Sequence, residues 1–432
     1  MMPFPRLIND AVTRNILSNV RTNSYRYSPQ EILKQLQPSS LLSVKRSTER
    51  FFMYEEGIQD MPTITVPPNE LATLLSSNRN SNDYHYYWTQ PISAMQSTNN
   101  NILNEEFKWY KQLHNDKDKA LDPRGPSLWC VHIYCYLIIQ SSFSHKLYLL
   151  SRMGTYGSGT QCHYDVANNI ILQLYGTKRI RCYPPSMGIY NLHVFPDNHP
   201  KARKSQVDFD YDTQKHNNND MINRFPHYYQ HIPQPTLDVT LQPGDALQIP
   251  AFWFHHVENG YRSDSYDGEE SSTVSLNTFS LSKPMLIAQQ IFQKASNPMG
   301  RSIDKEQVPS ILRSLGITLL QKIDIDEVTT GKEMDFIRTY LLEARYTPLV
   351  DSDTTSKQVQ QILTNEDMQT INTCIEKIIP DFCLLIKGEV EEDDQDGTGI
   401  ALLVALHLFE LWAVELVGTK SVAKAWDEAL SR

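Results

Sequence analysis

The stretch GTQCHYDVANNIILQLYGTKRIRCYPP, residues 159–185, decides how the rest of the chain is interpreted. It places an imidazole and a carboxylate, His163 and Asp165, one residue apart just before an apolar run. Along a strand, residues i and i+2 point to the same side, so both side chains would present donor atoms to one interior point. Burying these groups is costly unless they have partners. The pattern therefore predicts a functional pair at the start of a buried strand.

Short β-prone runs surround this stretch, and each is closed by Gly, Pro or Asp turn chemistry. The runs are KLYLLSRMG, IILQLYGTKRIRCYPP, TLDVTLQPGDALQIPAFWFHHVE and STVSLNTFSL. Many short strands separated by turn signals indicate an antiparallel barrel or jelly roll rather than a parallel sheet. We therefore expect a mainly β fold whose jelly-roll core spans about 146–283.

The strand after the turn Pro243-Gly244-Asp245 carries His255 and His256, and a jelly roll can bring one of them opposite the first pair. Two His and one carboxylate on one face leave coordination positions open. That arrangement is typical of non-haem Fe(II) oxygenases and unlike closed structural zinc. Open positions suit O2 and a chelating 2-oxo acid co-substrate. The pattern predicts an iron site.

The far carboxylate of such a co-substrate needs a fixed cation, and Lys178 lies on the returning strand TKRIR. Alternation places Lys178 and Ile180 on one face and Arg179 and Arg181 on the other, so Lys178 is the inward candidate. A basic surface strand is the alternative interpretation.

The whole chain divides into four predicted parts. They are an N-terminal arm and helix at 1–49, the oxygenase domain with the jelly-roll core at 50–283, helices at 284–348, and a further helical region with an acidic linker at 349–432. SPQEILKQL carries a Ser-Pro cap signal followed by helical spacing. RFFMYEE and DYHYYWTQPI are aromatic, β-prone runs. The Asn-rich segment 215–235 and the charged segment 259–272 are predicted to be loops.

Composition limits the function classes. The net charge of −10 disfavours nucleic-acid backbone binding, which needs a basic face. The six cysteines form no CxxC pair, which fits a reducing compartment. We expect a cytoplasmic or nuclear protein, although the Arg-containing N-terminus faintly resembles a mitochondrial presequence. The apolar run 399–418 could span a membrane, but His407, Glu410 and Glu415 favour a buried or dimer-facing helix and no membrane.

Together these motifs resemble the JmjC family of Fe(II)/2-oxoglutarate-dependent oxygenases. The likeness rests on Thr160-Gln161-Cys162-His163-Tyr164-Asp165, on Asn169, Gln173, Gly176, Lys178 and Pro184-Pro185, and on PGDALQIPAFWFHHVE. Within the family, NHPKARKSQVDFDYD at 198–212 is similar to the asparaginyl hydroxylases that act on hypoxia-inducible factor. The resemblance covers about residues 50–348. It implies a double-stranded β-helix core of the cupin type with C-terminal helices.

The resemblance also implies roles by position. His163, Asp165 and His255 match the iron ligands, and His256 takes a supporting position outside that set. The residues that match groups around 2-oxoglutarate are Lys178, Thr160 and Tyr87 at its distal carboxylate and Asn169 and Asn277 beside the co-substrate and iron. An Arg-Gln pair that grips the target amide is replaced here by Arg203-Lys204, so the target residue is left open.

The function that follows is a dioxygenase with Fe(II), 2-oxoglutarate and O2 that hydroxylates an Asn, Asp, His or similar protein side chain and releases succinate and CO2. The alternatives are a JmjC histone lysine demethylase, a tRNA-modifying hydroxylase, and a non-catalytic metal-binding cupin scaffold. The helices at 284–348 resemble dimerising helices of the family. Their apolar stripe, Ile311, Leu315, Leu319 and Phe336, fits either a homodimer or packing within one chain.

Overall fold

The computed structural model describes the larger part of the chain, in two compact units. The described residues are 5–7, 18, 20–48, 62–76, 84–91, 149–209, 220–230, 232–260, 272–280, 282–323, 325, 328, 330–346, 363–387 and 396–431. The predicted strand RFFMYEE, most of the predicted loop at 259–272 and most of the acidic linker lie outside them. One unit comprises residues 3–183 and 235–282, and we call it the β unit. The other comprises residues 1–2, 184–234 and 283–432, and we call it the helical unit.

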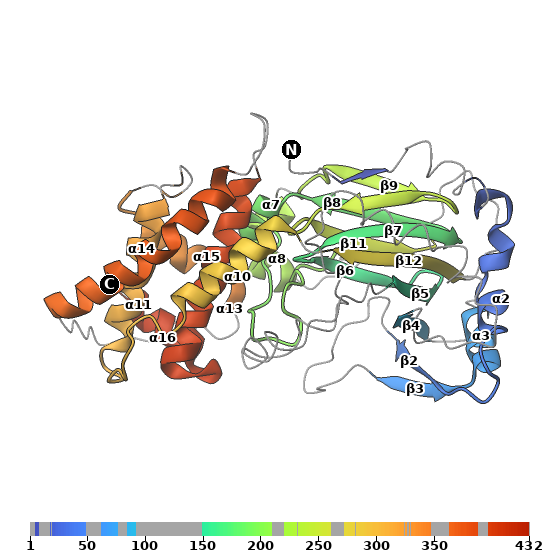
Figure 1. The fold of residues 1–432 in the computed structure, drawn as a ribbon, viewed down its shortest axis with the longest axis horizontal. Coiled ribbons are helices and arrows are strands. Elements are labelled where there is room, and N and C mark those ends of the chain that lie inside the picture. Colours follow the sequence, from blue (N-terminus) through green and yellow to red (C-terminus); the bar gives the residue numbers. More distant parts are fainter. Residues whose placement is uncertain are drawn as a thin grey trace. The chain divides into compact units, whose positions relative to one another are not determined.

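The β unit is built from two antiparallel sheets (Figure 1). Its strands are β1 (Arg6–Leu7), β2 (Leu42–Ser47), β3 (Thr63–Val66), β4 (His85–Pro91), β5 (Leu149–Thr155), β6 (Gly159–Tyr164), β7 (Asn168–Tyr175), β8 (Lys178–Tyr183), β9 (Leu237–Leu241), β10 (Ala246–Ile249), β11 (Phe254–Asn259) and β12 (Ser272–Ser280). The larger sheet has the order β1-β10-β7-β12-β5-β4-β2-β3, and the smaller has the order β6-β11-β8-β9. The alternation of β5 to β12 between the two sheets is the double-stranded β-helix, so the predicted fold class is confirmed.

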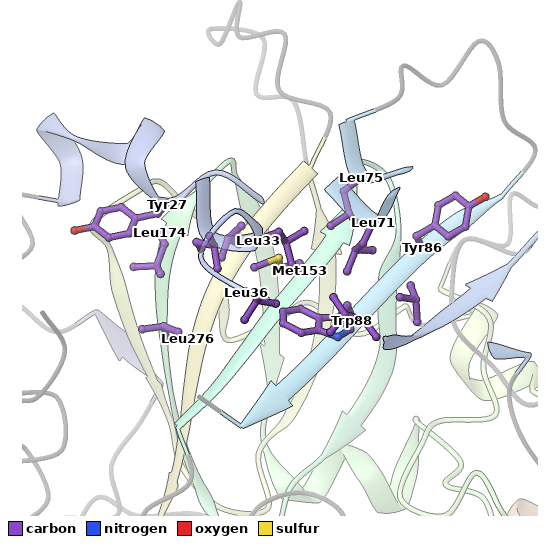
Figure 2. Packing of buried hydrophobic residues seen from close by; sticks show 14 of the residues in the cluster. Tyr27, Leu33, Leu36, Leu71, Leu75, Tyr86, Trp88, Met153, Leu174 and Leu276 are labelled. Atoms are coloured by element: carbon purple, nitrogen blue, oxygen red, sulfur yellow. The ribbon is translucent and has the colours of Figure 1, made fainter. Parts of the chain in front are cut away.

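The larger sheet is buried on both faces because its strands carry two sets of apolar side chains. The outer face carries one buried cluster, which we call the outer cluster and which includes Leu172, Leu276, Met153 and Trp88. Helices α2 (Pro29–Leu33) and α3 (Pro68–Ser76) cover this cluster with Leu33, Leu71 and Leu75, and Leu36 adds to it just after α2, as Figure 2 shows. Ser28 caps α2 as predicted, since its Oγ accepts a hydrogen bond from the Glu31 backbone N–H at 3.4 Å.

The inner face of the larger sheet packs against the smaller sheet around a second cluster. Ile171 and Leu247 come from the larger sheet, whereas Ile180, Cys182 and Val257 come from the smaller. Because side chains alternate along a strand, the residues two or four positions away from these on the same strand also face the interior. This interior is where the predicted ligands fall.

The helical unit contains the helices of the chain's second half together with those of the segment 184–234. They are α7 (Pro185–Tyr190), α8 (Asp220–Arg224), α9 (Pro226–Gln230), α10 (Lys283–Ala295), α11 (Val308–Ile323), α12 (Glu333–Ile337), a π-helical turn (Arg338–Glu343), α13 (Ala344–Tyr346), α14 (Asn365–Lys387), α15 (Gly397–Val417) and α16 (Val422–Leu430). The prediction of an uninterrupted loop at 215–235 is wrong, because α8 and α9 form there. Pro226 begins α9 at the first helical position, where its missing N–H costs nothing.

Helix α11 buries the apolar stripe considered for dimerisation inside this unit. Ile311, Leu315 and Leu319 are fully buried, and Phe336 is nearly so. Helix α11 packs against α14 and α16, which supply the covering surfaces. These side chains are therefore used within the chain, and the homodimer stays a prediction.

Among the described helices, α15 alone is long and apolar enough to cross a membrane. About two thirds of its apolar stretch, 67%, is buried inside the protein. Its acidic residue Glu410 is fully buried and accepts a hydrogen bond from Arg345 Nη1 at 2.9 Å. Such burial is typical of the core helix of a helical unit, as the sequence predicted.

Candidate active site

Three predicted iron ligands meet inside the β unit. One donor atom from each of His163, Asp165 and His255 lies within 4.8 Å of the other two. The two His residues pair directly across β6 and β11, and their ring centroids are 4.2 Å apart. His255 Nε2 lies 3.6 Å from Asp165 Oδ2. No other group of this kind is found in the described part of the chain.

Backbone carbonyls orient both imidazoles. His163 Nδ1 lies 2.8 Å from the Gln161 carbonyl oxygen, and His255 Nδ1 lies 3.1 Å from that of Trp253. A carbonyl oxygen can only accept, so Nδ1 is the protonated nitrogen in each neutral ring and Nε2 carries the lone pair. This is the tautomer that metal-binding His residues adopt when a backbone carbonyl holds the other nitrogen.

Burial also keeps His255 neutral. Its pKa is lowered chiefly because the ring is removed from water, although the Asp165 carboxylate and the Trp253 carbonyl oppose this. A neutral ring can donate its lone pair to a cation without first losing a proton. The set of two imidazole nitrogens and one carboxylate oxygen therefore fits a divalent transition metal with open coordination positions.

His256 lies on the other face of β11. Its Nε2 is 3.8 Å from Glu258 Oε1, and Glu258 also lies 3.5 Å from Arg181 Nη2. The strand thus separates the two adjacent His residues, one facing the interior and one facing away.

Lys178 faces the interior, as alternation predicted. It is 5% exposed, and its Nζ donates a hydrogen bond to Ser275 Oγ at 2.6 Å. On the opposite face of β8, Arg179 makes two hydrogen bonds to Asp238 at 2.8 and 2.6 Å. The pKa of Lys178 is lowered to about 7, first by burial and then by the nearby Arg152 guanidinium.

A hydrogen-bonded row joins Lys178 to the two predicted asparagines. Ser275 Oγ lies 3.5 Å from Asn277 Oδ1, and Asn277 Nδ2 donates to Asn169 Oδ1 at 3.2 Å. Ser275 was not predicted from the sequence. Its signal was present, because Ser275 and Asn277 are two residues apart in STVSLNTFSL and therefore share a face.

A β-bulge brings Thr160 to the interior face. Thr160 lies three residues before His163, so regular alternation would point the two in opposite directions. In the structure His255 pairs with His163 and Val257 pairs with Thr160, so β6 has one extra residue at this point. The extra residue returns Thr160 to the side on which Val257 and the two ligand imidazoles lie.

Tyr87 lies on the interior face of β4. Its neighbours Tyr86 and Trp88 belong to the outer cluster, so alternation turns Tyr87 inward, opposite Gly154 of β5. Its contact with a co-substrate carboxylate stays a prediction. Arg203 and Lys204 lie in the helical unit, between α7 and α8, and their role toward a substrate also stays a prediction.

Arg152 is a further cation at this site that was not predicted from the sequence. On β5 it pairs with Ser275 of β12, and its neighbour Met153 is in the outer cluster. The guanidinium therefore points to the interior, where its charge lowers the pKa values of both Lys178 and His255.

Two antiparallel sheets around a cluster of two His and one Asp define a double-stranded β-helix protein with a candidate metal centre. The chain belongs to the cupin-like domain family, whose model matches residues 5–280.

Two curated proteins resemble part of the chain. The tRNA wybutosine-synthesizing protein 5 of Danio rerio is 30% identical over 106 residues, which is 24% of this chain and 27% of that protein. The HSPB1-associated protein 1 of Bos taurus is 29% identical over 111 residues, which is 25% of this chain and 20% of that protein. The chain therefore spans about a quarter or less of the length of these relatives.

A solved structure, the X-ray structure of E. coli ycfD, aligns with 88% of this chain and 65% of its own. The identity is 11% and the TM-score is 0.28. At that TM-score the likeness supports no conclusion about fold or function.

Proposed function

We propose that the chain is an Fe(II)- and 2-oxoglutarate-dependent dioxygenase that hydroxylates a protein side chain. The observation that carries the proposal is the convergence of His163, Asp165 and His255, whose donor atoms lie within 4.8 Å of one another. The ring tautomers leave both Nε2 atoms as donors, and the carboxylate balances part of the cation's charge. This donor set fits ferrous iron, with positions to spare for a chelating co-substrate and O2.

The same interior offers groups suited to a dicarboxylate. Lys178 donates to Ser275 but is paired with no acidic side chain by any contact among the described residues. A buried ammonium without a carboxylate partner is unfavourable, so an anionic ligand would stabilise it. Lys178, with Thr160 and Tyr87, is proposed to hold the distal carboxylate of 2-oxoglutarate.

Bound iron would supply the redox chemistry, in which O2 is reduced as 2-oxoglutarate becomes succinate and CO2 and one oxygen atom enters a substrate C–H bond. The residues of the chain would bind the metal, line the site and exclude water. Asp165 and the two imidazoles would hold the metal, and Asn169 and Asn277 would form the polar wall beside it. The second apolar cluster, which includes Ile171 and Val257, excludes water from the interior.

A protein substrate is proposed because 198–212 resembles asparaginyl hydroxylases and because the net charge is −10. Arg203 and Lys204 are the candidates for contact with the target. A second candidate function is modification of tRNA, favoured by the match to tRNA wybutosine-synthesizing protein 5. The two functions share the metal chemistry and differ in the substrate.

The test is turnover with two substrate pools. The purified chain, Fe(II) and 2-oxoglutarate are incubated separately with cell-extract protein and with total tRNA, and succinate release is measured. We expect succinate release with the protein pool and a mass gain of one oxygen atom on a peptide, both abolished by His163→Ala. Succinate release with tRNA alone would instead support the second candidate.

A metal-binding control separates the ligand assignment from general damage. His163→Ala and His255→Ala are expected to lose stoichiometric binding of Co(II) under anaerobic conditions. His256→Ala, on the opposite face of β11, is expected to keep one Co(II) per chain. Equal loss in all three variants would refute the assignment of the ligands.

A further inference from the structure

Arg152 and Lys178 lie on either side of the same serine in the interior of the β unit. Arg152 is in register with Ser275 on the neighbouring strand, and Ser275 Oγ accepts the hydrogen bond from Lys178 Nζ. Residues in register on adjacent strands have Cβ atoms about 5 Å apart and project to the same side. The two cationic side chains therefore enter the same space, one from each sheet.

The Arg152 side chain extends from the level of Ser275 toward the metal ligands. Its Cζ lies 5.6 Å from the ring centroid of Phe279, which is two alternations further along β12 on the same face. Phe279 pairs with Asn169, near the start of the strand that follows Asp165. The guanidinium is thus placed between Lys178 and the ligand cluster. The nearby Arg152 guanidinium also lowers the pKa of Lys178, which agrees with this position.

No carboxylate neutralises Arg152 within the described part of the chain. Its Nε is buried without a hydrogen-bond partner, and no salt bridge joins its guanidinium to an acidic residue. The other arginines of this unit's core strands differ, since Arg179 and Arg181 lie beside Asp238 and Glu258. A guanidinium with no acidic partner in a protein interior is unfavourable unless an anionic ligand pairs with it. A planar, forked donor of this kind is suited to a carboxylate.

We propose that Arg152 binds the 2-oxo-acid end of the co-substrate, donating to the 1-carboxylate while Lys178 holds the distal carboxylate. The inference rests on the proposed function, because it assigns the second charge of that same co-substrate. Two cations facing one interior match the two carboxylates of 2-oxoglutarate. Arg152 is then a second co-substrate-binding cation beside Lys178.

The experiment measures equilibrium binding without turnover. Wild type, Arg152→Met, Lys178→Met and Arg179→Met are loaded with Mn(II) under anaerobic conditions. Dissociation constants are measured for 2-oxoglutarate and for pyruvate, a 2-oxo acid that lacks the distal carboxylate. Arg179 is the matched control, because its guanidinium is paired with Asp238 on the outer face of β8.

Arg152→Met is expected to weaken binding of both acids, each by roughly 10- to 100-fold, as for a lost charge-assisted hydrogen bond. Lys178→Met should weaken 2-oxoglutarate binding alone, and Arg179→Met should weaken neither. Arg152→Lys should bind more tightly than Arg152→Met but less tightly than wild type, because lysine keeps the positive charge and lacks the paired N–H donors of the guanidinium. Thermal unfolding of metal-free Arg152→Met should match or exceed wild type, since the substitution removes an unpaired charge.

Two results would overturn the inference: unchanged 2-oxoglutarate binding in Arg152→Met, or a loss for 2-oxoglutarate that spares pyruvate. The second would place Arg152 at the distal carboxylate. Failure of the proposed function looks different, because the wild type itself would then bind neither acid.

Discussion

At the scale of single residues, the interior of the β unit holds two cationic side chains, Lys178 and Arg152, for which the described residues supply no acidic partner. Lys178 is buried with a serine hydroxyl as its hydrogen-bond partner, and Arg152 has no acidic partner among the residues that the structure describes. Proteins rarely keep such charges without a use, because each one costs folding free energy. The deficit of negative charge at this place is what a dianionic co-substrate would correct.

The depressed pKa of Lys178 makes this cost measurable. The pKa is about 7 in the folded chain against 10.5 for an ordinary lysine, so below pH 7 the folded state bears the full penalty of the buried charge. As the pH rises from 7 to 10.5, the folded chain loses the proton first and its stability rises. Metal-free Lys178→Met should therefore be more stable than wild type at pH 6, by up to about 5 kcal/mol.

The measurement is urea unfolding of both proteins between pH 6 and pH 10. The difference in unfolding free energy should shrink steadily above pH 7. Lys424→Met, at a side chain that is 80% exposed in the helical unit, is the control and should show no such trend. A wild type more stable than Lys178→Met at pH 6 would contradict the burial of an unpaired charge.

At the scale of elements, the turn between β7 and β8 determines the position of Lys178, the first residue of β8. Gly176 has φ of 65°, a left-handed conformation that favours glycine. A Cβ at this position would collide with the Ser272 carbonyl oxygen and lie 3.2 Å from Thr273 Cα, both backbone atoms of β12. The turn can approach β12 only because the side chain is absent.

Gly176→Ala is therefore expected to lower the unfolding free energy by about 2 kcal/mol or more and to weaken 2-oxoglutarate binding through displacement of Lys178. Gly300→Ala is the matched control, because Gly300 has φ of 66° and a Cβ added there would meet no atom within 4 Å. It should show only the conformational cost, about 1 kcal/mol. Calorimetric unfolding of each variant checks both values, and equal losses would show that contact with β12 is unimportant.

How much the sequence could predict depends on whether a signal was local. The pair His163 and Asp165 and the inward direction of Lys178 follow from simple alternation, and the structure places all three in the interior. Thr160 reaches the interior through a bulge, which depends on the register of β6 against β11 and has no local signature. Only the likeness to a known family pointed to it.

Arg152 illustrates a different limit. Its strand was predicted, and Met153 beside it could have indicated which residues face outward. The sequence could not show that no acid would pair with the guanidinium, because that depends on strands distant in the chain. The loop predicted at 215–235 failed for a simpler reason: its polar, Asn-rich composition masks the helical turns α8 and α9.

At the scale of the whole molecule, the long apolar helix α15 forms part of the buried core of the helical unit. Helix α15 packs against α7, α14 and α16, and its polar residues are matched within the same unit. Glu410 accepts hydrogen bonds from Arg345 Nη1 at 2.9 Å and from the Asp197 backbone N–H at 3.0 Å. Burial raises the pKa of Glu410, and Arg345 and His407 oppose that shift.

The ion pair between Arg345 and Glu410 gives a test of this arrangement, because both side chains are almost completely buried. Removing one partner of a buried pair leaves an uncompensated charge and typically costs about 3–5 kcal/mol, so Arg345→Met alone should strongly destabilise the protein, to a similar extent. Replacing both, with Arg345→Met and Glu410→Leu together, should restore much of the loss because neither charge of the pair is then left without its partner. Urea unfolding of the two single variants and the double variant provides the cycle. Additive losses would mean that the two side chains are solvated independently, and α15 would then not be the buried core of this unit.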